Sequence, residues 1–533
     1  MKIQTPKLLT DQQVQQFIVD GYLILKPSVD PSLHKVIDEK FCWLSANETN
    51  PGNNILPRLP ELNQILESPE VRGAMISLLG ENYITCTHCF WHGRKPSEKE
   101  FSPEQVRQQV IDGSHQDNYC PAAIGMSHQM QYLRFMYYSH DMEEKMGPTH
   151  IVPGSQYHAK ISDEDRVRQM PVLGEAGTVF ISHFDLIHAG CPNQSDRTRN
   201  MIKFLFIRNS VNNKIQWDMK DPTWSHAGNS SLPYAVESCW EHQWENLIGK
   251  KHIGHSEEVV DDVFTAPKNL EGIELSDAIQ NLPVNINSKD FLISQLNKGH
   301  QAVRTSAIYA LIKLGKDIFP DLEKILSETK APKEFLDEKR LVNLNVSFDD
   351  ITEVLIGIGE ESLEVIETLM NSEEEWVVLN ALHYLNISGC SNEKIISKLE
   401  ELADHKSTYI VSWVCLALGY VGNEKHIPVL LNIIGAKYEQ EQYAKHENAE
   451  HPLEWPEEWM VHYHAALSLV RLAKYCEPYE DKIAEHLHHS YGQASMMICE
   501  CLRRMGSYTA LEKLAYFYSA HRWDASLKAK RSF

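Results

Sequence analysis

GTVFI, residues 177–181, is the stretch that decides the fold of the N-terminal part of the sequence. Its β-branched and aromatic residues lie between turn-forming residues, which is typical of a short buried strand. Similar candidate strands occur at residues 22–25, 83–91, 129–139, 149–152 and 201–206, with Pro, Gly, Asn and Asp between them. Many short strands without alternating helices favour two β-sheets or a closed barrel. We therefore predict a double-stranded β-helix (a jelly roll of the cupin-like kind) with flanking helices.

The first element of the chain is predicted to be a helix. Thr10 and Gln13 have the spacing of a capping box, and Gly21 can end the helix in a left-handed conformation. Further helical sequence extends to about Ala46. The β-region is thus expected to be covered by helices from its own N-terminus.

An apolar phrase recurs in the C-terminal half. It is ALIKLG at 310–315, VLIGIG at 354–359, ALGYVG at 417–422 and CLRRMG at 501–506, with weaker copies at 381–385 and 469–473. Each phrase is predicted to end one helix and to be followed by a second amphipathic helix, as at residues 318–326 and 427–434. Paired helices that repeat at roughly 30–45 residues predict an α-solenoid, similar to about five or six HEAT repeats. An irregular helical bundle is the alternative.

These patterns divide the chain into three parts. Residues 1–213 are the predicted β-domain, residues 214–290 an extension followed by a linker, and residues 291–533 the solenoid. Tryptophans at positions 217, 224 and 240 argue against disorder of the extension, which we expect to wrap on the β-domain.

Composition excludes several classes of function. A net charge of −22 over 533 residues disfavours binding to the phosphates of nucleic acid. The sequence has neither a signal-peptide pattern at its start nor an apolar run of roughly 18 residues, so we expect no membrane segment. Its 11 cysteines are scattered and lack a disulfide-framework spacing. We therefore expect a cytoplasmic protein.

A candidate metal site lies around the predicted strands. His115 and Asp117 would point to the same face of an extended segment, with Gln116 facing away. His188 follows the strand at 177–181 and is well placed to join them. Two histidines and one carboxylate can occupy one face of an octahedral Fe(II) ion and leave the opposite face open, as in non-haem iron oxygenases. Histidines 128, 140, 150, 158 and 183 are rival candidates on position alone.

The residues around this site resemble the phytanoyl-CoA dioxygenase family of Fe(II)- and 2-oxoglutarate-dependent oxygenases over about residues 8–209. The matching motifs are LTDQQ at 9–13, DGYL at 20–23, SHQD at 114–117, GPT at 147–149, VPGS at 152–155, GTVF at 177–180, HAGCPN at 188–193 and SDRTR at 195–199. The resemblance implies that His115, Asp117 and His188 are the iron ligands. It places Arg199 at the 2-oxoglutarate position, with Arg197 as the nearby rival.

The resemblance also implies a reaction. Iron, 2-oxoglutarate and O2 would together hydroxylate, or otherwise oxidise, a C–H bond of a small molecule and release succinate and CO2. Related halogenases have a small residue at the position of Asp117, so the carboxylate there argues against halogenation. Gly190 departs from the family, which often has a serine at that position. Arg94 and Lys95 could bind a carboxylate, but we expect both in a solvated loop.

Two other functions are compatible with the sequence. The enzyme could instead hydroxylate a protein side chain that the solenoid grips, or the chain could be a catalytically silent scaffold. Solenoids present long surfaces for protein partners or self-association. The substrate is not encoded in these motifs, because fold and cofactor define the chemistry while the pocket walls define specificity. Met136, Tyr138 and Tyr119 are candidate wall residues.

Overall fold

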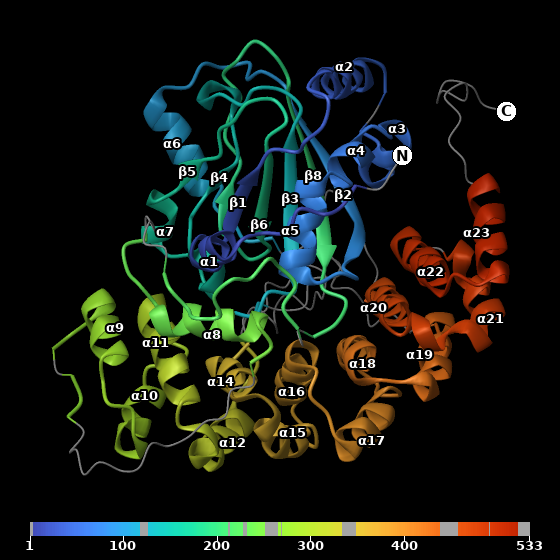
Figure 1. The fold of residues 1–533 in the computed structure, drawn as a ribbon. Helices are drawn as coiled ribbons and strands as arrows, with labels where there is room; N and C mark the ends of the chain where they lie inside the picture. Colours follow the sequence, from blue (N-terminus) through green and yellow to red (C-terminus); the bar gives the residue numbers. More distant parts are fainter. Residues whose placement is uncertain are drawn as a thin grey trace, which may run out of the picture.

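The computed structural model describes residues 4–48, 50–117, 126–211, 214–226, 232–250, 265–267, 269–332, 348–437, 457–489 and 491–520. A β-rich N-terminal part lies against a curved array of helices formed by the C-terminal half (Figure 1). None of the described helices is long and apolar enough to cross a membrane.

Two antiparallel sheets form the centre of the N-terminal part. The larger has the order β1-β6-β3-β8-β2, and the smaller has the order β5-β4-β7. The strands of the larger sheet are β1 (Tyr22–Leu25), β6 (Val179–His183), β3 (Tyr132–Tyr138), β8 (Arg199–Ile207) and β2 (Ile84–Arg94). The smaller sheet contains β4 (His150–Ile151), β5 (Met170–Pro171) and β7 (His188–Ala189). The strands predicted from the sequence are confirmed, with shifts of a few residues at their ends.

Side-chain alternation gives the large sheet two different faces. On β3, Met136 and Tyr138 are buried in one apolar cluster with Ile151 of the small sheet. Their neighbours Leu133 and Phe135 belong to a second cluster, on the opposite face. The first face therefore looks toward the small sheet, and it is this face that carries the candidate site.

Helices from the N-terminal region cover the second face. They are α1 (Asp11–Asp20), α2 (Ser32–Asn47), α3 (Ile55–Arg58), α4 (Leu62–Leu66) and α5 (Pro69–Leu79), while α6 (Pro103–Asp112) and α7 (Asp163–Val167) lie beside the small sheet (Figure 1). The predicted capping box of Thr10 and Gln13 is present in α1. Gly21 ends this helix with φ of 77°, a conformation that glycine adopts without strain.

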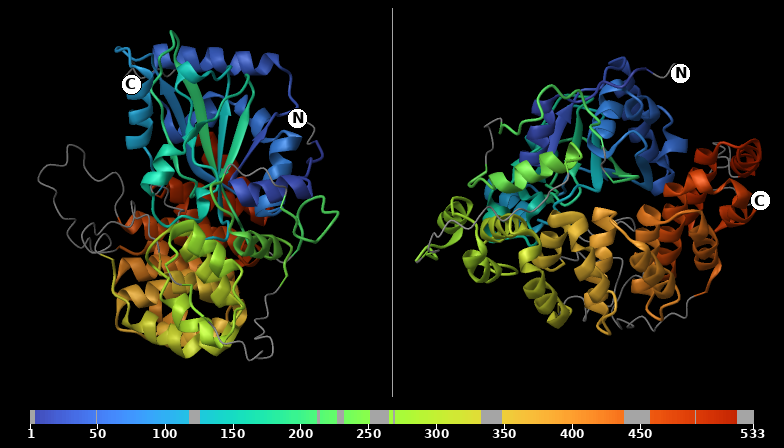
Figure 2. Two further views of the ribbon diagram at one scale, coloured as in Figure 1. Left: turned by 90° about the vertical axis from the view of Figure 1, so that its left-hand side faces the viewer. Right: turned by 60° about the horizontal axis from the view of Figure 1, so that its bottom comes forward.

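Helix pairs make up the C-terminal half. The first helices of the pairs are α11 (Gln301–Ile312), α14 (Asp350–Ile358), α16 (Glu375–Ser388), α18 (Thr408–Val421), α20 (Glu457–Arg471) and α22 (Gly492–Met505). The second helices are α12 (Phe319–Glu328), α15 (Leu363–Leu369), α17 (Glu393–Leu402), α19 (Ile427–Gly435), α21 (Glu480–Ala484) and α23 (Tyr508–Ala520). Each recurring phrase lies at the end of a first helix, as predicted, and successive first helices contact one another along a curve (Figure 2).

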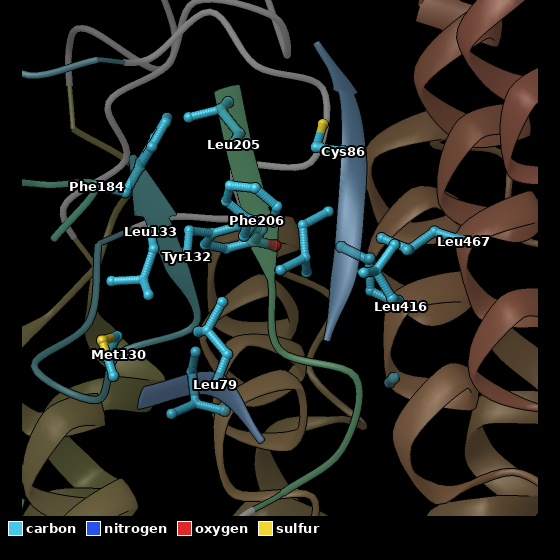
Figure 3. Packing of buried hydrophobic residues seen from close by; sticks show 14 of the residues in the cluster. Leu79, Cys86, Met130, Tyr132, Leu133, Phe184, Leu205, Phe206, Leu416 and Leu467 are labelled. Carbon is cyan, nitrogen blue, oxygen red and sulfur yellow. The ribbon is translucent and has the colours of Figure 1, made fainter. Parts of the chain in front are cut away.

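The first helices also face the N-terminal part. Leu416 of α18 and Leu467 of α20 lie beside strand β2 near Cys86, in a cluster that continues to Phe206 of β8 (Figure 3). The Tyr463 hydroxyl lies 3.5 Å from the Cys86 sulfur. The two halves of the chain thus share one continuous apolar core.

The segment between the two halves differs from its prediction as an extension and linker. The indole of Trp217 donates to Asp11 of α1 (2.7 Å), so the extension does pack on the N-terminal part. The segment also contains two helices, α8 (Glu237–Leu247) and α9 (Gly272–Gln280). The Ser276 hydroxyl of α9 lies 2.9 Å from that of Ser306 in α11, so the helical packing begins before residue 291.

Candidate metal centre

His115 and His188 are held together by their backbones. They form an isolated antiparallel bridge in which each amide donates to the other carbonyl at 2.9 Å. The extended segment predicted at His115 forms this isolated bridge and belongs to no named strand. The bridge places the two imidazoles side by side, with ring centroids 4.2 Å apart.

The same ring nitrogen of each histidine is engaged by a backbone carbonyl. Nδ1 of His115 lies 2.8 Å from the Gly113 oxygen, and Nδ1 of His188 lies 3.1 Å from the Leu186 oxygen. Since a carbonyl only accepts, Nδ1 must carry the proton in both rings. Each Nε2 then keeps its lone pair, which is the form of histidine that binds a metal.

Asp117 completes the group. Its Oδ1 lies 3.6 Å from Nε2 of His188 and 3.9 Å from Nε2 of His115. Ligand atoms of the three residues all lie within 4.8 Å of one another, and no other described group of His, Cys, Asp and Glu meets this condition. Two neutral imidazoles and one carboxylate are a donor set that fits Fe(II). The rival histidines in the described residues do not join such a group.

Charge holds the carboxylate in its ionised form. Burial raises the pKa of Asp117, but the nearby guanidinium of Arg134 and ammonium of Lys203 outweigh it and hold this pKa well below its usual range. Burial, followed by the charge of Arg134, lowers the pKa of His188 well below its ordinary value. Both residues are therefore in their metal-binding protonation states near neutral pH.

Arg199 lies at the start of β8, on the face of the large sheet that looks toward the small sheet. Its Nη1 donates to the Gly147 carbonyl (2.8 Å), whereas its buried Nε has no hydrogen-bond partner among the described residues. The buried hydroxyl of Tyr138 lies near this guanidinium and beside Thr149. A buried donor without an acceptor is costly, so this end of the site is suited to an anionic ligand such as a carboxylate.

Arg197 points elsewhere. It lies just before β8, outside the strand that carries Arg199, and its guanidinium pairs with Asp38 of α2. Of the candidate wall residues, Met136 and Tyr138 are buried beside the site, while Tyr119 lies outside the described residues.

Two cations of the site, Arg134 and Lys203, were not singled out by their sequence, and the position of a third, Arg94, was predicted wrongly. Arg134 and Lys203 alternate with apolar residues on β3 and β8, which gives no local sign of a charged interior. Arg94 was expected in a solvated loop, but it ends β2, opposite Arg199, and its guanidinium donates to the Cys191 carbonyl. A charge within a predicted strand, on the side of the metal ligands, is the signal that could have identified them.

The N-terminal part of the chain matches a model of a known protein family. Residues 8–201 match the family model described as phytanoyl-CoA dioxygenase (PhyH). No curated protein matches the chain.

Among solved structures, the chain is similar to the non-heme alpha ketoglutarate dependent epimerase SnoN from nogalamycin biosynthesis, with 16% identity, a TM-score of 0.30, and coverage of 37% of this chain and 80% of that one. For the carbocyclase SnoK from the same biosynthesis, the identity is 15%, the TM-score is 0.30, and the coverage is 39% and 88%. For AviO1 from Streptomyces viridochromogenes Tue57, the identity is 16%, the TM-score is 0.27, and the coverage is 37% of this chain and 95% of that one.

Proposed function

We propose, on the premise that residues 8–201 form a domain of the phytanoyl-CoA dioxygenase family, that the protein is an Fe(II)- and 2-oxoglutarate-dependent dioxygenase. It hydroxylates, or otherwise oxidises, a C–H bond of a small molecule. The observation that carries the proposal is the convergence of His115, Asp117 and His188 within 4.8 Å. In this proposal the two sheets are a double-stranded β-helix, residues 1–213 are the catalytic domain, and the helix pairs are HEAT-like repeats.

The three ligands have distinct tasks. His115 and His188 offer Nε2 because the Gly113 and Leu186 carbonyls hold the protons on Nδ1. Asp117 supplies the negative charge. When bound, iron with 2-oxoglutarate and O2 supplies the oxidation of the C–H bond, with release of succinate and CO2.

Arg199 orients the co-substrate. Its Nε and the Tyr138 hydroxyl are buried donors that can bind the distal carboxylate of 2-oxoglutarate. The Gly147 carbonyl fixes the guanidinium by accepting from Nη1. Arg94 lies on the neighbouring strand and adds positive charge, and Gly190 leaves space beside it, since a Cβ there would be 3.5 Å from its Nη1. Asp117 as third ligand favours hydroxylation or a related oxidation over halogenation.

The contacts of the helical half favour a small-molecule substrate over a gripped protein. The inner face of the array is occupied by the N-terminal part of the same chain: Tyr420 donates to Gln131 (3.2 Å), and Arg504 donates to the Tyr83 carbonyl (3.0 Å). A protein substrate would have to bind elsewhere on the array. Association through the outer helices, with a partner or a second copy, remains compatible with this arrangement.

One experiment tests the proposal. Fe(II) and 2-oxoglutarate are added anaerobically to the purified protein, and the weak visible charge-transfer band of the complex is recorded. We expect a band for the wild type and none for His188→Ala. Succinate release measured across a panel of metabolites then identifies the substrate. Absence of the band in the wild type would refute the proposed enzyme and favour a silent scaffold.

A further inference from the structure

The two oxygens of the Asp117 carboxylate have different surroundings. Oδ1 faces both imidazoles, at 3.6 Å from His188 Nε2 and 3.9 Å from His115 Nε2. Oδ2 faces two cations. Arg134 reaches it with Nε at 2.9 Å and Nη2 at 2.6 Å, and Lys203 Nζ lies 3.5 Å away. One oxygen is thus turned to the metal ligands and the other away from them.

Arg134 is itself rigidly held. Its side chain is fully buried on β3, Nη2 also donates to the Phe184 carbonyl at 2.7 Å, and Nη1 lies 3.4 Å from the Ser182 hydroxyl. A guanidinium fixed at several donors has little freedom to follow a moving carboxylate. The side chain of Lys203, on the neighbouring strand β8, is 5% exposed, and its Nζ forms an ion pair with Oδ2.

We propose that Arg134 is a positioning residue of the metal site, and that Lys203 is a positive charge that weakens metal binding at this site. Arg134 retains Oδ2, so Asp117 presents only Oδ1 to the metal. A carboxylate that binds through one oxygen occupies one coordination position instead of two, which leaves room for co-substrate. Lys203 adds a positive charge that opposes the positive charge of the metal. The inference rests on the metal site of the proposed function and concerns residues outside its ligand set.

The test uses Co(II) in place of iron, with the full chain and without 2-oxoglutarate. Metal-free protein is titrated anaerobically, and the visible d–d absorption reports both affinity and coordination number. Arg134→Lys keeps the charge but loses the fork of donors. We expect it to weaken Co(II) binding about tenfold, the effect of losing a charge-assisted hydrogen bond, and to change the intensity of the band. Lys203→Met keeps the Arg134 contacts and is expected to tighten Co(II) binding about tenfold, because a nearby like charge is removed.

The matched control is Arg208→Lys. Arg208 is another buried arginine of the same sheet region, and it donates to the Met130 and Leu78 carbonyls. Its replacement should leave Co(II) affinity and the spectrum unchanged. A role in folding alone would lower the stability of Arg134→Lys while its folded fraction binds Co(II) like the wild type, and that result would overturn the inference.

If Arg134→Lys does not fold, Lys203→Met still tests the proposal. Unchanged or weaker Co(II) binding by Lys203→Met would overturn the proposal that the charge of Lys203 weakens metal binding. Failure of the proposed function has a different outcome. A wild type that binds Co(II) but produces no charge-transfer band with Fe(II) and 2-oxoglutarate would refute the dioxygenase and leave the positioning of Asp117 intact.

Discussion

His115 and His188, although far apart in the chain, exchange two backbone hydrogen bonds of 2.9 Å and bring their rings to a centroid distance of 4.2 Å. The backbone pairing of two extended segments therefore places two of the three candidate ligands side by side.

Replacing His188 tests the metal centre directly. His188→Ala removes one of three ligands, and we expect metal affinity to fall by at least about 100-fold, with loss of turnover. The measurement is Co(II) titration together with succinate release. His150→Ala is the matched control, because His150 lies on the adjacent strand β4, opposite Ala189, and outside the ligand group. Equal losses in both variants would argue against the assigned ligands.

The two arginines near β8 should differ in their effect on 2-oxoglutarate. Arg199→Met removes a buried guanidinium, and we expect the Kd for 2-oxoglutarate to rise about 10- to 100-fold, from the loss of charge-assisted hydrogen bonds. Arg197→Met breaks only a partly exposed pair with Asp38 and should leave this Kd within about twofold. The Kd is measured from the charge-transfer band. The reverse order would assign the co-substrate to Arg197.

Gly147 supports Arg199 through its backbone. Its φ is 72°, and a Cβ there would lie 2.5 Å from the Cys191 carbonyl oxygen. We expect Gly147→Ala to lower the free energy of unfolding by about 1–3 kcal/mol and to weaken 2-oxoglutarate binding. Gly435→Ala, in α19 of the helical array, is the control, since its Cβ meets an ordinary contact distance of 3.8 Å. Denaturant unfolding and the charge-transfer titration check both effects, and a wild-type Kd in Gly147→Ala would separate this loop from the co-substrate site.

Arg471 links the helical array to the N-terminal part. Its Nη2 lies 3.5 Å from the Arg208 carbonyl of the N-terminal part and donates to the Tyr420 hydroxyl of α18 at 2.7 Å, and its guanidinium lies 3.9 Å from the centre of that ring. We expect Arg471→Met to lower the free energy of unfolding by about 2 kcal/mol, through loss of a buried charged hydrogen bond. Arg503→Met removes a mostly exposed guanidinium from Glu500, which keeps its pair with Arg504, and should change it by less than about 0.5 kcal/mol. Urea unfolding followed by circular dichroism distinguishes the two.

The pH dependence of stability should contain a contribution from His462 in α20. Burial, followed by the charge of His489, lowers the pKa of His462 to about 4. Its Nε2 donates to the Ala436 carbonyl, and Nδ1 lies 3.1 Å from Nε2 of His489.

The direction in which stability changes with pH follows from proton uptake by His462. Between pH 6.5 and 4 the unfolded chain binds a proton at this position and the folded chain does not, so stability is full above pH 6.5 and falls as the pH decreases toward 4. His462→Gln should reduce this slope when free energies of unfolding are measured across that pH range. An unchanged slope would assign the acid sensitivity to other groups.

The sequence by itself determined the elements whose signals are local. The capping box of Thr10 and Gln13 and the stop at Gly21 act within one helix, and the recurring phrases lie at the ends of successive first helices. The sequence also predicted His115, Asp117 and His188 as candidate ligands, through motifs that resemble those of the phytanoyl-CoA dioxygenase family, and the structure brings these three residues together.

Only the tertiary structure decided which charges meet. Arg134 and Lys203 reach the same oxygen of Asp117 because of the register of β3 with β8. The position of Arg197 outside β8 likewise decides that it pairs with Asp38 while Arg199 faces the site. Helices α8 and α9 and the docking of the helical array depend on apolar contacts between distant segments. Local signals depend on contacts within a few residues, whereas these pairings depend on which faces pack together, and that is decided by the free energy of the whole fold.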